Sequence, residues 1–419
     1  MNTETRALPE TPGPVTALPS RPREASVPRA ARWLLRMLEG LHAGSLDITG
    51  PDGSRWHFSG KAPGPAAAIR IADWSMCGAV LRSGDIGFAE SWIDGRWNTD
   101  DLQSVLWVAA LNKRVLDSAI YGRWWGTLAA RLRHLLNGNS RRGSRRNIAA
   151  HYDLGNDFYR LWLDETMLYS AALFEGDPDR SLADAQRAKL ARVFTMMSPQ
   201  PGQRVLEIGC GWGGFAELAA REGLHVTGLT LSERQLEWAL NRVRAAGVAD
   251  RVDLKLLDYR DVAGTFDRIV SIEMFEAVGR KYWATYFHRV RELLAPDGIA
   301  CIQTITIDDG EFDRYVLGTD FIQQYIFPGG MLPSPSAFRA LAGDAGLVVE
   351  DAQPFGLDYA RTLHAWRIAF DRVTPELDAL GYDERFRRTW RFYLAYCEAG
   401  FRAGLTDVWQ YRLRKPAGA

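Results

Sequence analysis

The chain has 419 residues, 47% hydrophobic and 24% charged, and its 51 basic and 51 acidic side chains give a formal net charge of zero. This length exceeds one typical hydrophobic core, so we expect two domains with tails. A neutral chain creates no overall field that recruits nucleic acid or an anionic membrane, which disfavours a nucleic-acid partner held by global charge.

Residues 1–30 are predicted to form a disordered tail. Six prolines lie among small and charged residues, and the segment lacks the apolar core of a secretory signal. No window along the chain approaches the roughly 18 apolar residues that a membrane span needs. We therefore expect any contact with lipid to be peripheral.

The four cysteines lie far apart and form neither a CxxC pair nor a Cys/His ligand spacing. This spacing disfavours a metal site and favours reduced thiols, which are typical of cytoplasmic proteins. We therefore predict no metal and a cytoplasmic location. The cysteines are Cys77, Cys210, Cys301 and Cys397.

Residues 31–115 predict a small α+β domain, in which short strands are followed by helical stretches with Gly/Asp turns. Its run 84–102 is dense in aromatic and acidic residues. Composition favours a small core built on Trp92 and Trp97, and a lipid-handling or partner module is the alternative. The strands are expected around 46–48, 56–58 and 68–71.

Residues 116–147 predict a basic amphipathic linker. Tryptophans and leucines are combined with arginines here, and the run 137–147 carries four arginines without an acid. Such a segment can lie on an anionic bilayer with its arginines on phosphates. The alternative is a solvated linker.

Residues 205–214 join an apolar strand to a glycine-rich turn, and 215–221 are predicted to continue as a helix. Glycines let the backbone bend sharply and approach a nucleotide-like ligand at the helix N-terminus. The E-x-G-C-G-x-G spacing does not fit the dinucleotide fingerprint, because an acid precedes the turn and no third glycine opens the helix. It resembles motif I of S-adenosylmethionine-dependent methyltransferases. A turn whose glycines serve packing alone is the alternative.

Four more strands are predicted after this turn, in alternation with helices. This order implies an α/β fold with a doubly wound parallel sheet, whose strand ends converge on one crevice. The helix predicted over 282–294 is expected to close at 296–298. The strands are expected over 226–231, 254–257, 266–272 and 299–305.

A series of ordered motifs between about residues 85 and 414 resembles the cyclopropane fatty acid synthases, including the mycolic acid cyclopropane synthases. The resemblance implies that 148–419 form a Rossmann-like class I methyltransferase domain with acyl-channel insertions, in which 312–338 are a candidate tunnel wall. The run 84–102 resembles the N-terminal lipid-binding-like domain of longer bacterial members. The remaining motifs are 151–164, 167–170, 186–190, 207–214, 229–235, 273–279, 321–330 and 359–366, with Cys397, Trp409 and Gln410.

The family transfers the sulfonium methyl of S-adenosylmethionine to a cis double bond in a membrane phospholipid acyl chain. By this resemblance we expect an enzyme that makes a cyclopropane fatty acid at the inner face of the membrane. The alternative product is a methyl- or methylene-branched acyl chain. Two alternative classes of protein are a small-molecule methyltransferase and a lipid-binding protein with a degenerate enzyme domain. A homodimer and a reductase partner are left open.

The resemblance also assigns residues to the cofactor. Aromatic faces suit a sulfonium, apolar walls and amides suit adenine, and a carboxylate or amide suits ribose hydroxyls. Either Glu207 or a polar group on the next strand is expected to serve the ribose. The predicted cofactor residues are Tyr169, Ser170, Glu207, Gly209, Cys210, Gly211, Thr230, Leu231, Ser232, Gln235, Asp258 and Tyr259.

In the family, a bicarbonate ion beside a Cys, a Glu, a His, an Ile and a Tyr removes the proton that closes the ring. Glu276, Ile305 and Tyr359 match those positions, whereas Ala171 replaces the Cys and Gln303 replaces the His. A backbone N–H at Ala171 and an amide at Gln303 could still donate to an anion. The missing imidazole nevertheless favours weaker anion binding and lowers the expectation of ring closure.

Two candidate catalytic residues have structural alternatives. Taken alone, Glu276 reads as a strand-end carboxylate paired with Arg280 or Lys281. Cys397 follows an apolar helix and taken alone reads as a buried core cysteine. The resemblance makes Cys397 an active-site candidate, although its thiol performs no step that methyl transfer requires.

Overall fold

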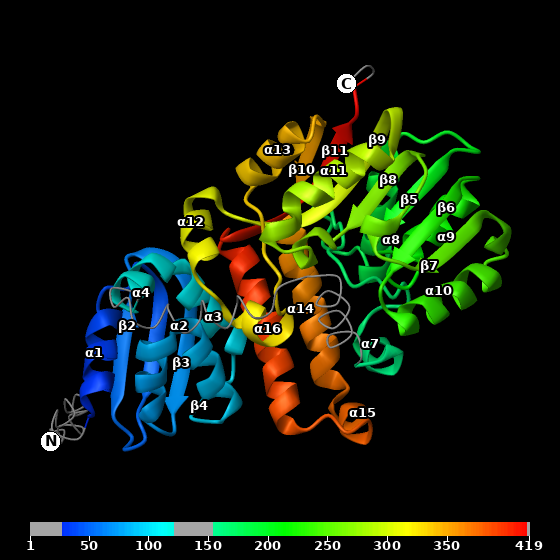
Figure 1. The fold of residues 1–419 in the computed structure, drawn as a ribbon. Helices are drawn as coiled ribbons and strands as arrows, with labels where there is room; N and C mark the ends of the chain where they lie inside the picture. Colours follow the sequence, from blue (N-terminus) through cyan, green and yellow to red (C-terminus); the bar gives the residue numbers. More distant parts are fainter. Residues whose placement is uncertain (1–26, 121–153, 417–419) are drawn as a thin grey trace, which may run out of the picture.

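The computed structural model describes residues 27–120 and 154–416. Nearly all of the tail predicted over 1–30 and most of the linker predicted over 116–147 lie outside these residues. The described chain forms a small N-terminal sheet with helices, a larger sheet with helices, and a helical hairpin between the two (Figure 1).

The N-terminal domain has a four-stranded sheet in the order β2-β1-β3-β4, in which β1 runs antiparallel to β2 and parallel to β3. Alternate side chains such as Leu46, Ile48 and Ile69 are buried, as the period of a one-sided sheet requires. The strands are β1 (Ala43–Thr49), β2 (Arg55–Ser59), β3 (Ala62–Ile71) and β4 (Trp97–Asn98), and the helices are α1 (Arg29–Leu38), α2 (Ser75–Ile93), α3 (Leu102–Leu111) and α4 (Lys113–Ile120).

Trp92 and Trp97 belong to the core of this domain. Trp97 is fully buried, and its ring stacks on Phe88 with 4.3 Å between the centroids. Trp92 is also buried and lies 5.1 Å from Trp97. The prediction that these two tryptophans form the core of the N-terminal domain is therefore confirmed.

The larger sheet has seven strands in the order β10-β11-β9-β8-β5-β6-β7. Strands β5 to β9 are parallel, as predicted, and β10 and β11 add an antiparallel edge that was not predicted. The strands are β5 (Arg204–Ile208), β6 (His225–Thr230), β7 (Val252–Leu256), β8 (Phe266–Ile272), β9 (Leu294–Ile307), β10 (Val348–Pro354) and β11 (Thr406–Arg414).

The turn expected at 296–298 lies inside a strand instead of ahead of one. Strand β9 begins at Leu294, directly after α11, and pairs Leu294 with Phe266 and then Ile299 with Arg268. The residues between these two pairs form a bulge on β9, so the Pro-Asp-Gly sequence produces a β-bulge.

Helices cover both faces of this sheet. One face, with Val205, Val226 and Cys301, packs against α8, α9 and α10, and the other, with Leu206 and Ile302, packs against α11 and α13. The expected doubly wound arrangement is therefore present. The helices are α7 (Asn156–Trp162), α8 (Leu182–Met197), α9 (Gly214–Arg221), α10 (Glu233–Ala245), α11 (Trp283–Leu293), α12 (Asp309–Leu317), α13 (Pro335–Asp344), α14 (Gly356–Arg372), α15 (Thr374–Ala379) and α16 (Glu384–Arg402).

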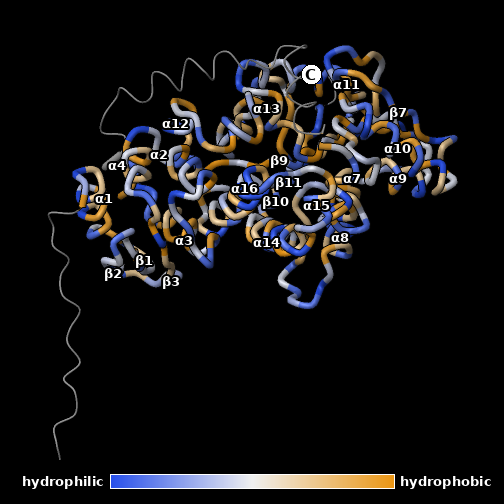
Figure 2. Tube along the Cα trace, turned by 90° about the horizontal axis from the view of Figure 1, so that it is seen from below, coloured by the Kyte–Doolittle hydropathy of each residue, from blue (hydrophilic) through white to orange (hydrophobic). Residues whose placement is uncertain are grey.

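The hairpin of α14 and α16 lies between the two sheets (Figure 1). Phe88 of α2 packs on Phe392 of α16, and Arg388 of α16 donates to the Trp92 carbonyl at 2.7 Å. Figure 2 shows hydrophilic residues interrupting hydrophobic ones throughout the described chain. Within 27–120 and 154–416, no helix combines the length and the apolar character needed to cross a bilayer.

Candidate active site

The predicted cofactor residues gather at the carboxyl ends of the parallel strands. Glu207 lies near the end of β5, Thr230 ends β6, and Asp258 follows β7. The turn after β5 is tied to β6, because Gly209 N–H and Cys210 N–H both donate to the Leu229 carbonyl, at 3.0 and 2.7 Å. These residues therefore lie at the edge of the sheet where open α/β folds bind their ligands.

The glycines of the turn have different roles. Gly209, Gly211 and Gly213 all have positive φ, at 86°, 51° and 81°. A Cβ at Gly209 would lie 2.9 Å from Met274 Cγ, and one at Gly213 would lie 2.9 Å from Ala239 Cβ, so both allow close packing. A Cβ at Gly211 would meet no atom within 4 Å, so packing does not explain this glycine.

The polar groups at these strand ends are partly engaged. Glu207 is buried, burial raises its pKa well above the ordinary value, and its Oε2 has no hydrogen-bond partner among the described residues. The Thr230 hydroxyl donates to Gln235 Oε1 at 3.0 Å, and Ser232 caps α10. Both Asp258 oxygens bind the Arg260 guanidinium. Glu207 therefore keeps the acceptor that a ribose hydroxyl requires.

Two more of the predicted cofactor residues, Tyr169 and Ser170, come from the segment before α8. The Tyr169 and Tyr393 hydroxyls share a hydrogen bond of 2.7 Å, and the Tyr169 ring lies 5.2 Å from Trp366. The Ser170 hydroxyl accepts from Lys189 Nζ at 2.6 Å. The two remaining predicted cofactor residues are Leu231, which is half-buried, and Tyr259, which is buried against Tyr286.

A carboxylate that the sequence analysis did not select occupies the centre of the predicted catalytic group. Glu273 Oε1 accepts from Ala171 N–H and from Gln303 Nε2, both at 2.7 Å. Its Oε2 accepts from the Tyr359 hydroxyl at 2.7 Å. Burial raises the pKa of Glu273, and these donors oppose that rise.

These residues do not fit a bound bicarbonate. The backbone N–H of Ala171, the Gln303 amide and the Tyr359 hydroxyl are the donors that the resemblance assigned to the anion, and all three bind Glu273. The chain therefore carries a carboxylate of its own at the position where an external anion was expected.

The backbone aims Glu273 into this position. It is the first residue after β8 and has a φ of 49°, which is uncommon for a residue with a side chain. Its N–H donates to the Gln303 carbonyl at 2.8 Å. Such strain is often found at functional sites, and neither the motif nor the periodicity revealed it.

Glu276 lies beside Glu273 but has different partners. Its Oε1 accepts from Ile305 N–H at 2.5 Å and from the Thr304 hydroxyl at 3.0 Å, while its Oε2 has no partner among the described residues. Burial, and then the charge of Glu273, raises the pKa of Glu276 to about 8. The donors around Glu273 thus favour its ionised form, whereas burial and the neighbouring charge favour the protonated form of Glu276.

A buried cation lies between the cofactor turn and this pair. Lys189 is fully buried, and burial lowers its pKa to about 8, although the negative charges of Glu273, Asp164 and Glu207 oppose the shift. Its attraction to Glu273 favours the ionised form of that carboxylate.

Cys397 has the environment of a core cysteine. It is half-buried on α16, and burial raises the pKa of its thiol well above the ordinary value. A thiol in this state is a poor nucleophile. The thiol therefore has no ionised form available near neutral pH.

The segment proposed as a tunnel wall is folded around buried polar contacts. Gln323 Nε2 donates to the Tyr315 hydroxyl and to the Gly330 carbonyl, both at 3.1 Å, and Phe321 is fully buried against Phe392. A π-helix, Ile322–Ile326, forms its centre. The tunnel itself stays a prediction.

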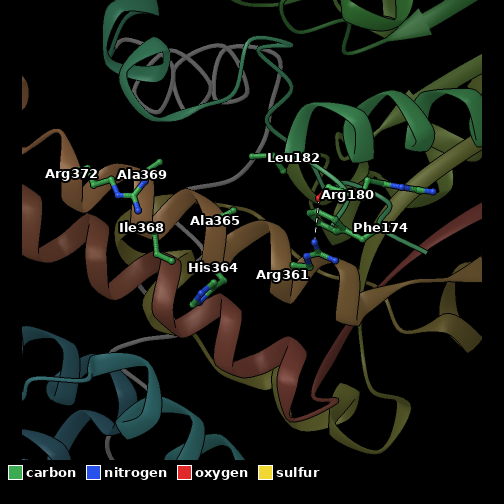
Figure 3. A pocket seen from close by; sticks show the side chains of 9 residues that line it. All are labelled: Phe174, Arg180, Leu182, Arg361, His364, Ala365, Ile368, Ala369 and Arg372. Carbon is green, nitrogen blue, oxygen red and sulfur yellow. Dashed lines mark hydrogen bonds between the residues drawn. The ribbon is translucent and has the colours of Figure 1, made fainter. Parts of the chain in front are cut away.

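A surface hollow lies apart from this site, along α14 (Figure 3). Arg361 covers the Phe174 ring at 3.9 Å and donates to the Pro178 carbonyl. None of the predicted catalytic or cofactor residues lines the hollow. Arg180 and Arg361 hold the loop before α8 through hydrogen bonds to its backbone carbonyls.

Comparisons with known proteins identify relatives of the chain. The family model described as mycolic acid cyclopropane synthetase matches residues 139–411. The tuberculostearic acid methyltransferase UfaA1 of Mycobacterium tuberculosis is 42% identical, with 83% of each chain covered. The cyclopropane-fatty-acyl-phospholipid synthase of Escherichia coli K12 is 38% identical, with 84% of this chain and 88% of that protein covered.

Solved structures agree with these relatives. The cyclopropane synthase MmaA2 of Mycobacterium tuberculosis has a TM-score of 0.61 and 33% identity, covering 65% of this chain and 98% of its own. The mycolic acid cyclopropane synthase CmaA1, in complex with SAH and CTAB, has a TM-score of 0.60 and 34% identity with the same coverage.

Proposed function

Because the chain belongs to the mycolic acid cyclopropane synthetase family, we propose that it methylates an unsaturated acyl chain of a membrane phospholipid and uses Glu273 as its base. The family is S-adenosylmethionine-dependent and cyclopropanates or methylates unsaturated lipids. The observation that carries the proposal is the Glu273 carboxylate, which accepts the three donors expected around an external anion.

The residues at the strand ends fit S-adenosylmethionine. Gly211 leaves open space beside the turn, and Glu207 keeps a buried acceptor without a partner among the described residues. When bound, S-adenosylmethionine supplies an electrophilic methyl group on a sulfonium. Tyr169 offers an aromatic face to that cation, and Gln235 offers an amide.

An alkene is a weak nucleophile, so the enzyme must align it and keep water away from the cation that follows. The alkene π electrons would form the new carbon–carbon bond as the S–CH3 bond breaks and its electron pair stays on sulfur, which leaves SAH. The neighbouring acyl carbon becomes electron-deficient. A hydride then shifts from the methylated carbon to that neighbour. Glu273 Oε2, which accepts a hydrogen bond from the Tyr359 hydroxyl, takes a proton from the added methyl, and the C–H electrons form a double bond between the former methyl carbon and the branch carbon.

The product of these steps is a methylene-branched acyl chain. Two observations support it over ring closure: the residues do not fit bicarbonate, and a relative with 42% identity is a tuberculostearic acid methyltransferase. Conversion of the methylene to a methyl branch needs a hydride donor, which a reductase would supply. Ring closure is the second candidate, because the chain is 38% identical to a cyclopropane-fatty-acyl-phospholipid synthase.

The product is tested in cells that express this chain and receive an unsaturated fatty acid. Fatty acid methyl esters are analysed by mass spectrometry and NMR. We expect one added carbon with the proton signals of a C=CH2 group on the acyl chain. Cyclopropane proton signals would support the second candidate, and acyl chains without an added carbon would contradict both.

A further inference from the structure

A chain of buried hydrogen bonds leads from Arg192 to Glu273. Arg192 Nε donates to Gln410 Oε1 at 2.5 Å, Gln410 Nε2 donates to Gln303 Oε1 at 2.9 Å, and Gln303 Nε2 donates to Glu273 Oε1 at 2.7 Å. Gln410 and Gln303 are fully buried and face each other on the antiparallel strands β11 and β9.

The donor-to-acceptor direction of these hydrogen bonds is set by Arg192 at one end and by Glu273 at the other. A guanidinium only donates hydrogen bonds, an ionised carboxylate only accepts them, and an amide has one end of each kind. Arg192 therefore turns the Gln410 oxygen toward itself and the Gln410 nitrogen toward Gln303. Gln303 must then present its own nitrogen to Glu273.

We propose that Arg192 and Gln410 are positioning residues that hold the Gln303 amide as a donor to the Glu273 carboxylate. The inference rests on the proposed role of Glu273 as base. If the Gln303 amide were reversed, its oxygen would face Glu273 Oε1 at hydrogen-bond distance, and this would disfavour the ionised carboxylate.

Other groups around Glu273 also affect its ionisation. They are the Lys189 ammonium from α8, the Tyr359 hydroxyl from α14, the Ala171 N–H and the neighbouring Glu276. Variants at Arg192 and Gln410 change none of these side chains. Gln410 Nε2 also donates to the Lys189 carbonyl at 3.5 Å, so the Gln410 variants lose that contact as well. The Arg192 variants keep Gln410, and their effect on Glu273 is therefore transmitted through Gln410 and Gln303.

The experiment compares Gln410→Met with Gln410→Glu, and Arg192→Met with Arg192→Lys. Both Gln410 variants lose the donor to Gln303, but only Gln410→Glu adds a charge. We expect the acid limb of the kcat/KM profile to move to higher pH by about one unit in both Gln410 variants, which is about tenfold lower kcat/KM on that limb. Arg192→Met should move the acid limb by a similar amount. Arg192→Lys should move it less, because the lysine can still donate to Gln410.

The apparent affinity for SAH and the thermal unfolding midpoint are measured for every variant. An unmoved acid limb in Gln410→Met, or a uniform loss of rate at all pH values, would overturn the inference. Glu273→Gln separates the two proposals. Wild-type activity in Glu273→Gln would contradict the role of Glu273 as base, whereas an inactive Glu273→Gln with an unshifted Gln410→Met would contradict only the positioning role.

Discussion

Burial raises the pKa of two carboxylates three residues apart, Glu273 and Glu276, but the groups around Glu273 oppose the rise more strongly. Glu273 has three donors and a buried ammonium nearby, whereas Glu276 has two donors, a partnerless oxygen among the described residues and a pKa raised to about 8. A base must be ionised to accept a proton. The environment therefore selects Glu273 for that role.

Glu273→Gln is expected to lower lipid methylation by roughly 10²–10⁴, the usual contribution of a positioned general base. Glu276→Gln should retain far more activity, because the raised pKa of Glu276 favours its neutral form and the amide oxygen can still accept from Ile305 N–H. Methylated product per unit time is measured at pH 7, and the reverse ranking of the two variants would contradict the assignment.

Bicarbonate should not be required for turnover. The donors that would hold it are occupied by Glu273, so removal of carbon dioxide from the buffer is expected to leave the rate unchanged. The rate is measured in degassed buffer with and without added bicarbonate. A rate that rises in proportion to bicarbonate would show that the ion binds despite Glu273.

Cys397→Ser should keep most of its activity. Burial raises the pKa of this thiol, so it is not ionised near neutral pH, and methyl transfer needs no thiol. A matched test is treatment of the wild type with a thiol-alkylating reagent before the assay. Complete loss of activity in Cys397→Ser, with unchanged unfolding, would overturn this expectation.

At the scale of residues, the sequence predicted which side chains meet but not what they surround. Ala171, Gln303 and Tyr359 converge as the resemblance implied. The group at their centre, Glu273, was missed because only its left-handed φ directs it there. Hydrophobic periodicity does not reveal local backbone strain. The presence of a second carboxylate three residues before Glu276 could nevertheless have marked Glu273 as a candidate site residue.

At the scale of elements, the glycine-rich turn between β5 and α9 contains one glycine needed for packing and another that we expect to be needed for cofactor binding. Gly209→Ala should lower the free energy of unfolding by roughly 2–5 kcal/mol, because its Cβ would press on Met274 and its φ is also positive. Gly211→Ala should cost only ~1–2 kcal/mol for its positive φ, yet weaken binding of SAH by about tenfold or more, because its Cβ would enter the open space.

Thermal unfolding and calorimetric titration with SAH measure both effects of these glycine variants. Gly247→Ala serves as a control, because it also has a positive φ and open space around its Cβ but lies after α10. Gly211→Ala with unchanged SAH affinity would contradict the placement of the cofactor beside this turn.

The elements themselves were predicted where local signals are strong. Strand β8 covers the predicted 266–272, and β5 to β7 differ from prediction by a few residues at their ends. Strand β10, at the sheet edge, was missed because its sequence lacks an alternating apolar and polar pattern, and β11 was also missed. Their pairing with β9 is set by contacts distant in sequence, which also bring Gln410 opposite Gln303.

At the scale of the whole molecule, buried acids join the N-terminal domain to the methyltransferase domain. Asp85 of α2 accepts from Phe321 N–H at 3.1 Å and from the Tyr396 hydroxyl at 3.0 Å. Asp320, next to Phe321, has its pKa raised to about 7, first by burial and then by the charge of Asp85. Burial also raises the pKa of Asp85. The interface therefore raises the pKa of both acids.

This interface makes stability depend on pH. The pKa of Asp320 is near 4 in the unfolded chain and about 7 in the folded one, so its contribution is complete below pH 4 and is lost as the pH rises through about 7. Allowing for partial exposure, we expect Asp320→Asn to remove about 1–2 kcal/mol of the fall in unfolding free energy between pH 5 and 8. Chemical denaturation at both pH values measures it. Asp313→Asn, at an exposed position, is the control, and equal pH slopes in wild type and Asp320→Asn would show that the domains are not coupled through this proton.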